Sequence, residues 1–80
     1  NYPNPFNPST KISYSVPMTG TVALLVYDAL GREVETLVNS NKAAGTYVAE
    51  FNGEGKTSGI YFVKMTAGGF TSTRKMMLLK

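Results

Sequence analysis

A strand and a tight turn stand next to each other in TVALLVYDALGR, residues 21–32. Residues 21–28 are apolar at both odd and even positions, which is the pattern of a central strand that is covered on both faces. DALG, residues 28–31, fits a type I turn with Gly31 in the left-handed conformation. We therefore expect residues 32–38 to return as the partner strand of a hairpin.

Strand signals recur along the rest of the chain. Apolar residues alternate with polar ones at residues 10–16 and 45–51, as in strands that have one face in a core and one in water. Glycine-bearing turns separate these runs, and no window shows an apolar period of about 3.6 residues. The predicted strands are residues 10–16, 21–28, 32–38, 45–51, 60–66 and 70–79, with loops at 39–44 and 52–59.

These strands predict an all-β fold, an antiparallel β-sandwich without substantial helix. The chain has 80 residues, which suffice for a single domain with one core. Three prolines near the start fix their own backbone angles and extend the residues before them. Residues 1–9 are therefore predicted as an extended lead-in and residues 10–80 as the sandwich. The expected core residues are Leu24, Val26, Tyr47, Phe51, Tyr61, Val63 and Leu78.

The composition excludes several kinds of chemistry. The chain has no cysteine and no histidine, so it has no thiol nucleophile, no thiolate metal site and no ordinary catalytic triad. Its acidic residues are scattered, and Glu33 and Glu35 are expected on the solvent face of one strand. We expect no enzyme activity, no catalytic residue and no cofactor.

The charge pattern also limits the partners. The net charge is +3, and basic residues are spread along the chain until Arg74, Lys75 and Lys80 gather near its end. A nucleic-acid-binding domain normally carries a denser basic stripe. No apolar run approaches the roughly 20 residues that span a bilayer. We expect neither nucleic-acid binding nor membrane insertion.

Two small-molecule sites are conceivable. Asn52, Glu54 and Ser58 carry oxygen atoms that could bind calcium, but only one of them is an acid and their spacing matches no regular calcium loop. We therefore predict no metal site. Exposed aromatic rings could stack on sugars, but core packing accounts for most of the rings at strand positions, and tryptophan is absent. These rings are Tyr14, Tyr27, Tyr47, Tyr61 and Phe62.

Several motifs in register identify a family. Together they resemble the type A C-terminal sorting domain of type IX secretion cargo, which is itself similar to the immunoglobulin-like domain of flagellar hook-capping proteins. The resemblance covers essentially the whole chain. The motifs are YPNPFNPST at 2–10, VYD at 26–28 before GREV at 31–34, GTY at 45–47, SGIYF at 58–62 and TRKMMLLK at 73–80.

The resemblance implies an immunoglobulin-like sandwich of about seven strands at the C-terminus of a larger secreted bacterial protein. The chain begins with Asn1 and not with methionine, so we expect it to be part of a longer protein. The implied partners are an N-terminal cargo domain, the type IX translocon and a surface sortase that cleaves the domain. The implied location is the periplasm in transit, followed by the medium or the cell surface, where the family's cargo is released or attached to an anionic lipopolysaccharide.

By the same resemblance, the residues that the machinery recognises would lie in the lead-in, in two Gly-x-Tyr motifs and at the basic end. Each Gly-x-Tyr motif also has a structural explanation, because a glycine before a strand relieves strain and a buried tyrosine fills a core. Lys80 follows an apolar run without an evident packing role, which makes its charge the better recognition candidate. The recognition candidates are Pro3, Asn4, Pro5, Gly45, Tyr47, Gly59, Tyr61, Arg74, Lys75 and Lys80.

One motif departs from the family pattern. Members often carry Trp-Asp-Gly where this chain has Phe51-Asn52-Gly53, which argues against a loop role that depends on aspartate. An alternative function stays open at this stage. The chain could be an immunoglobulin-like spacer or a carbohydrate-binding appendage of a secreted multidomain protein.

Overall fold

The computed structural model describes residues 9–53 and 55–78, which form six strands and no helix. Among these residues, no helix is long and apolar enough to cross a membrane. The predicted all-β fold is confirmed. The lead-in at residues 1–8 lies outside the described residues, and Ser9 already belongs to the first strand. The strands are β1 Ser9–Val16, β2 Gly20–Asp28, β3 Glu33–Lys42, β4 Gly45–Asn52, β5 Gly59–Ala67 and β6 Phe70–Leu78.

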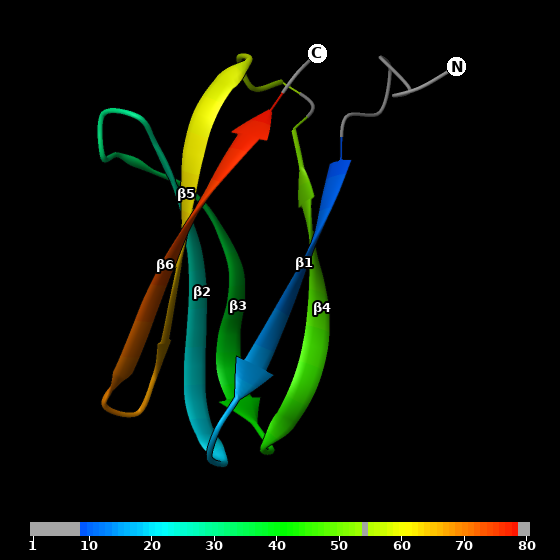
Figure 1. Ribbon diagram of the computed structural model, residues 1–80, viewed down its shortest axis with the longest axis vertical. Coiled ribbons are helices and arrows are strands. Elements are labelled where there is room, and N and C mark those ends of the chain that lie inside the picture. The colour runs from blue at the N-terminus through cyan, green and yellow to red at the C-terminus, as the bar shows by residue number, and fades with distance from the viewer. Residues whose placement is uncertain (1–8, 54, 79–80) are drawn as a thin grey trace.

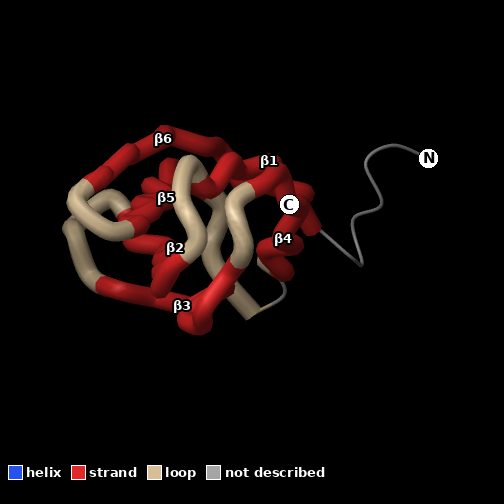
Figure 2. Tube along the Cα trace, turned by 90° about the horizontal axis from the view of Figure 1, so that it is seen from below, coloured by secondary structure: helices blue, strands red, loops and turns tan. Residues whose placement is uncertain are grey.

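The strands form two antiparallel sheets that pack as a sandwich (Figures 1 and 2). The small sheet holds β1 and β4, and the large sheet has the order β3-β2-β5-β6. We call the end where β1 begins and β6 ends the upper end, and the opposite end the lower end (Figure 1). The resemblance implied about seven strands, and the described residues provide six.

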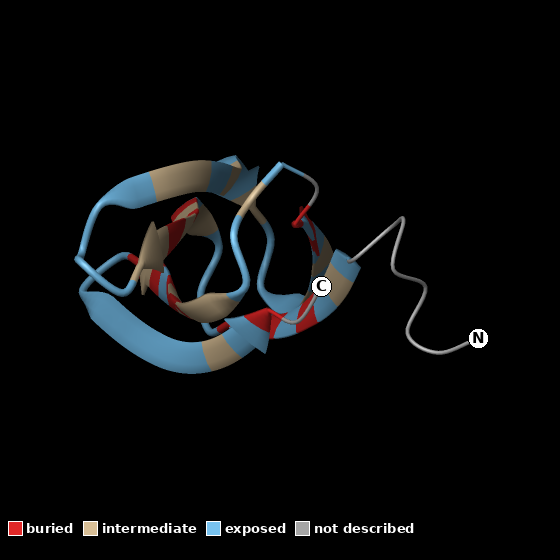
Figure 3. Ribbon diagram, turned by 90° about the horizontal axis from the view of Figure 1, so that it is seen from above, coloured by how far each residue is buried: buried red, intermediate tan, exposed pale blue. Residues whose placement is uncertain are grey.

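The core lies between the two sheets, where the alternating apolar residues meet (Figure 3). Tyr47 is the exception among the predicted core residues, because it is only half-buried. Its ring packs at the edge of the core and its hydroxyl group reaches the surface of the lower end. The other predictions are confirmed. The buried core consists of Ile12, Tyr14, Val16, Val22, Leu24, Val26, Phe51, Tyr61, Val63, Met65, Ala67 and Leu78.

The edge strand β3 differs from its prediction in two ways. It continues to Lys42, through residues 39–42 that were predicted as loop. These polar residues pair with residues 20–23 of β2, and an edge strand tolerates polar side chains because backbone pairing holds it in place. Two register shifts also interrupt the β2–β3 ladder, where Val34 and Leu37 have no direct partner. Such bulges rotate the following side chains to the other face.

The bulge at Val34 separates two glutamates that were predicted to share a face. Glu33 lies opposite Tyr27, whereas Glu35 lies opposite Val26, whose side chain points into the core. Side chains of directly opposed residues share a face, so Glu35 is turned toward the inner side. There its Oε1 lies 3.2 Å from Lys56 Nζ. The prediction that both glutamates point to solvent was wrong.

The turn after β2 has the predicted geometry. Gly31 has a φ of +87°, and its N–H donates to the Asp28 carbonyl at 2.9 Å. The Asp28 side chain organises this turn, since its Oδ1 accepts hydrogen bonds from the N–H groups of Leu30 and Arg32, each at 2.9 Å. Its Oδ2 lies 2.9 Å from Arg32 Nε. The DALGR sequence therefore closes the β2–β3 hairpin by local contacts alone.

These contacts predict how the hairpin responds to acid. The hydrogen bond from the Arg32 N–H, with the Arg32 guanidinium and the Leu30 N–H, lowers the pKa of Asp28 below its ordinary value. The group therefore stabilises the fold above the unfolded pKa of about 3.9, and this contribution is lost as the pH falls through the lower folded pKa. We expect an NMR titration of the Asp28 carboxyl to show a midpoint below about 3.9.

The matched variant is Asp28→Asn, which keeps an acceptor for the two N–H groups but cannot ionise. Its unfolding free energy should depend less on pH between about pH 2 and 5 than that of the unaltered chain. A carboxyl midpoint at or above the ordinary value would contradict the assignment.

Candidate functional site

The structure describes six of the predicted recognition residues: Gly45, Tyr47, Gly59, Tyr61, Arg74 and Lys75. Pro3, Asn4, Pro5 and Lys80 lie outside the described residues.

The first Gly-x-Tyr motif begins β4 at the lower end. Gly45 has a φ of +153°, and the Tyr47 hydroxyl donates to the carbonyl of Ala43 at 2.6 Å. The Tyr47 ring stacks on Tyr14, with 5.5 Å between the centroids, and Lys42 Nζ lies 5.1 Å from the Tyr47 centroid. Burial raises the pKa of the Tyr14 phenol, and Tyr47 adds to the increase.

The second motif begins β5 at the upper end. Gly59 has a φ of +151°, and the Tyr61 hydroxyl donates to the carbonyl of Thr57 at 2.7 Å. The Tyr61 ring is 4% exposed and lies 5.7 Å from the Phe51 ring across the two sheets. This tyrosine therefore links a loop to the centre of the core.

The two motifs share one local geometry at opposite ends of the sandwich (Figure 1). In each, a glycine of positive φ starts a strand, and the tyrosine two residues later bonds to the carbonyl four residues before it. We call this arrangement the tyrosine corner. It ties the loop to the strand, so both motifs have a structural role that needs no partner. Their role in recognition stays a prediction.

Backbone conformation makes the corner glycines sensitive to substitution. A methyl group at Gly59 would meet no atom within 4 Å, so strain at a φ of +151° is the remaining penalty. We expect Gly59→Ala to destabilise the domain by about 1–3 kcal/mol in urea unfolding. Gly69→Ala is the matched control, because that glycine has open space and no left-handed φ. Its effect should stay within about 1 kcal/mol, and equal losses for the two variants would argue against strain.

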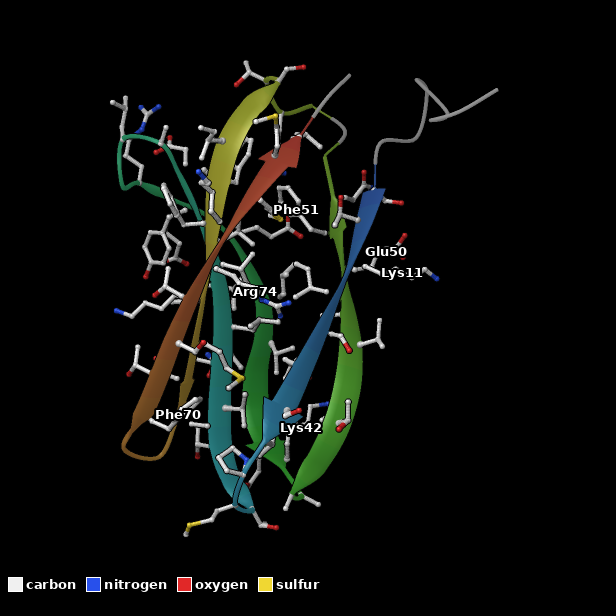
Figure 4. The ribbon with its side chains drawn as sticks, in the orientation of Figure 1. Lys11, Lys42, Glu50, Phe51, Phe70 and Arg74 are labelled. Atoms are coloured by element: carbon white, nitrogen blue, oxygen red, sulfur yellow. The ribbon has the colours of Figure 1, made fainter. Side chains whose placement is uncertain are left out.

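The two basic candidates that the structure describes, Arg74 and Lys75, lie on β6. Arg74 extends from this strand toward β1, and its guanidinium donates to the carbonyl of Ser13 (Figure 4). Lys75, which lies opposite Phe62 in the β5–β6 ladder, is exposed. Arg74 therefore bridges the two sheets, a role that the sequence analysis missed because it joins residues far apart in the chain.

The described candidates do not gather in one place. Gly59 lies opposite Leu78, so the upper tyrosine corner adjoins the end of β6. The corner of Gly45 and Tyr47 lies at the lower end (Figure 1). Any single partner that contacted both corners would have to follow the long axis of the domain, which measures 38 Å.

The family is decided by a comparison with known families. A family model for the secretion system C-terminal sorting domain matches residues 1–79. The chain belongs to this family. No curated protein and no solved structure matches the chain.

Membership confirms the resemblance that the sequence motifs indicated. A sorting domain is a signal that a secretion system reads, which implies a cargo part, a machinery that recognises the domain, and a secreted or cell-surface protein. The family is defined by delivery and not by catalysis. That this sorting domain has no enzyme activity stays a prediction.

The other ligand hypotheses find little support in the described part of this sorting domain. Residues 9–53 and 55–78 hold no group of three or more acidic side chains that could bind a metal ion. Glu54 lies outside the described residues, and independence from calcium stays a prediction. Of the aromatic rings considered for sugar binding, Tyr14 and Tyr61 are buried, whereas Tyr27, Tyr47 and Phe62 are half-buried. Tyr27 and Phe62 lie opposite each other in the β2–β5 ladder, on the face of the large sheet that points away from the core.

Proposed function

We propose that this domain is a type IX sorting signal that the machinery recognises in its folded form at the outer membrane. The cargo and the sorting domain pass through the periplasm together, and recognition of the domain commits the cargo to export. A surface sortase then cleaves the domain from the cargo. The match of the sorting-domain family to residues 1–79 carries this proposal.

The architecture supports recognition of a folded domain. Both tyrosine corners hold loops against strands, and Arg74 joins the edges of the two sheets. Such contacts keep surface groups in fixed positions, which lowers the entropy lost when a partner binds. Arg74, Lys75 and Lys80 are the residues that we propose for charge-assisted contacts with the machinery.

A reporter fusion tests the proposal. Residues 1–80 are fused behind a reporter that carries its own signal peptide, in a type IX-competent host and in the same host without its translocon. We expect the reporter outside the competent cells and in the periplasm of the deficient ones. A released reporter that has lost the mass of the domain would demonstrate cleavage. Retention of the reporter in the periplasm of both hosts would contradict the proposal and favour the spacer function.

A further inference from the structure

One side of the sandwich is open. Within residues 9–53 and 55–78, β1 pairs only with β4 and β6 pairs only with β5, so each has an edge without a partner strand there. Arg74 spans the gap between these two edges. The small sheet has two strands and the large sheet has four, so the small sheet cannot cover the whole inner face of the large one. Residues 70–75 of β6 are consequently exposed on both faces. We call the gap between β1 and β6 the seam.

The seam contains a groove with an apolar floor. On one side of Arg74 the groove has a volume of about 320 Å³, with Leu24, Val63, Met65 and Phe70 among its lining residues. Ser13, Ser15 and Ser72 contribute the polar part of the lining. Phe70 is 49% exposed, so part of this apolar surface is in contact with water. A second, smaller hollow of about 140 Å³ continues on the other side of Arg74.

The β1 edge of the groove can accept another strand. The Ser13 carbonyl faces the seam, because it accepts the hydrogen bond from Arg74 of β6. In an antiparallel ladder, residues whose polar backbone groups point outward alternate with residues whose groups point to the partner strand. The backbone groups of Lys11 and Ser15 therefore face the seam as well. Within the described chain no strand pairs with this edge.

The charge inside the groove comes from Arg74. Arg74 touches both hollows, and no carboxylate lines either. Lys11 and Lys75 border the smaller hollow, but their side chains lie on the outer faces of their sheets. Glu50 faces Lys11 across the β1–β4 ladder but lies outside the lining. Arg74 is bonded to a neutral carbonyl, which is a weaker partner than a carboxylate. The groove is thus complementary to an acidic segment.

We propose that the seam binds an extended acidic segment of a partner protein, which adds to β1 as a third strand of the small sheet. An inward-facing carboxylate of that segment pairs with Arg74, which leaves the Ser13 carbonyl. The freed carbonyl then accepts a backbone hydrogen bond from the added strand, and the apolar side chains of the segment cover Phe70 and Met65. This mode is strand addition to an exposed sheet edge. The inference rests on the proposed function, because the segment is taken to belong to the secretion machinery.

A proline placed on the free edge tests the strand addition in the secretion assay. Ser13→Pro removes an N–H that faces the seam and not β4, so the β1–β4 ladder keeps its hydrogen bonds. Val48→Pro is the matched control. Val48 lies opposite Ser13 in the same ladder, so its outward groups face the other edge of the small sheet. We expect the Ser13→Pro fusion to stay in the periplasm and the Val48→Pro fusion to be exported.

A peptide titration tests the charge preference without secretion. The probe is acetyl-Val-Thr-Asp-Thr-Val-amide, and the control peptide carries Asn in place of Asp. NMR of the isotope-labelled domain should show shifts at the amides of Lys11, Ser13, Ser15 and Ser72. The Asp peptide should bind about tenfold more tightly than the Asn peptide, as a charge-assisted bond predicts. In an Arg74→Gln domain this preference should disappear.

The outcomes separate the inference from the proposed function. If the unaltered fusion is not exported by the competent host, the proposed function fails. If the unaltered, Ser13→Pro and Val48→Pro fusions are all exported equally, the sorting function stands and the seam proposal is wrong. If circular dichroism shows that both proline variants are unfolded, the peptide titration tests the seam proposal in their place. Equal binding of the two peptides, or shifts away from the seam, would then overturn the proposal.

Discussion

Replacing Tyr61 with alanine is expected to destabilise the domain by about 3–5 kcal/mol, as large aromatic truncations in cores do. The ring is 4% exposed and packs against Phe51 of the other sheet. Its hydroxyl group also holds the Thr57 carbonyl, so the variant loses both the core packing and the upper tyrosine corner. A small domain is stable by only about 5–15 kcal/mol, and we expect a measurable unfolded population at 25 °C.

Urea unfolding monitored by circular dichroism measures this loss, and Tyr61→Phe separates its two parts. The phenylalanine variant keeps the ring and loses the hydrogen bond to Thr57, so it should be destabilised by about 0.5–1.5 kcal/mol. A loss below about 1 kcal/mol for Tyr61→Ala would mean that the ring does not belong to the core.

Replacing Phe51 with alanine should have an effect of similar size, about 3–5 kcal/mol. Phe51 is 0% exposed and is the largest of the fully buried side chains. Lys56 Nζ lies 5.5 Å from its ring centroid and also pairs with Glu35, so the ring supports the loop between β4 and β5. Urea unfolding measures the loss. Phe51→Leu fills most of the volume of the phenylalanine side chain, so it should lose less than half as much stability as Phe51→Ala.

The two rings should be coupled, because they touch across the sheets. A double-mutant cycle of Tyr61→Ala and Phe51→Ala should give an interaction energy of about 0.5–1.5 kcal/mol. Stability losses that add without interaction would contradict the contact seen between the rings. Phe51→Leu provides a stable background for the cycle if the double alanine variant does not fold.

These core variants also set a baseline for secretion. A domain that is read in its folded form loses export when its core is lost, whichever residue is changed. Variants of Tyr61 and Phe51 therefore cannot locate the recognition surface. Ser13→Pro and Arg74→Gln change the seam and leave the core residues in place, so their export can be interpreted once their folding has been verified.

The strand positions follow from the sequence by itself. The alternation at Ile12, Tyr14 and Val16 predicts which side chains are buried. The apolar run of β2 predicted a strand but not its buried face, because one face is buried and the other is only half-buried. The DALG turn and the glycines at strand starts were also predicted, because left-handed backbone conformations require particular residues locally. The sorting-domain motifs indicated the family that the comparison confirmed.

The edge strand β3 has two features that local sequence patterns do not predict. Its polar residues 39–42 carry no strand signal, yet they pair with β2 because that strand needs a partner on its open edge. The bulge at Val34 turns Glu35 inward toward Lys56, and no alternation rule that counts residues in twos could anticipate it. Both differences arise from pairing with β2, which the residues of β3 alone do not specify.

Only the tertiary structure decided which strands are neighbours. The sequence analysis did not indicate that β1 pairs with β4, or that Arg74 of β6 reaches β1, since these contacts join segments far apart in the chain. The Tyr61 ring against Phe51 and the Arg74 guanidinium on the Ser13 carbonyl follow from that arrangement. The sequence determined the elements, because burial and turn geometry are local properties of a few residues. The tertiary structure decided the seam, because which strands become edges depends on pairings between segments that are far apart in the chain.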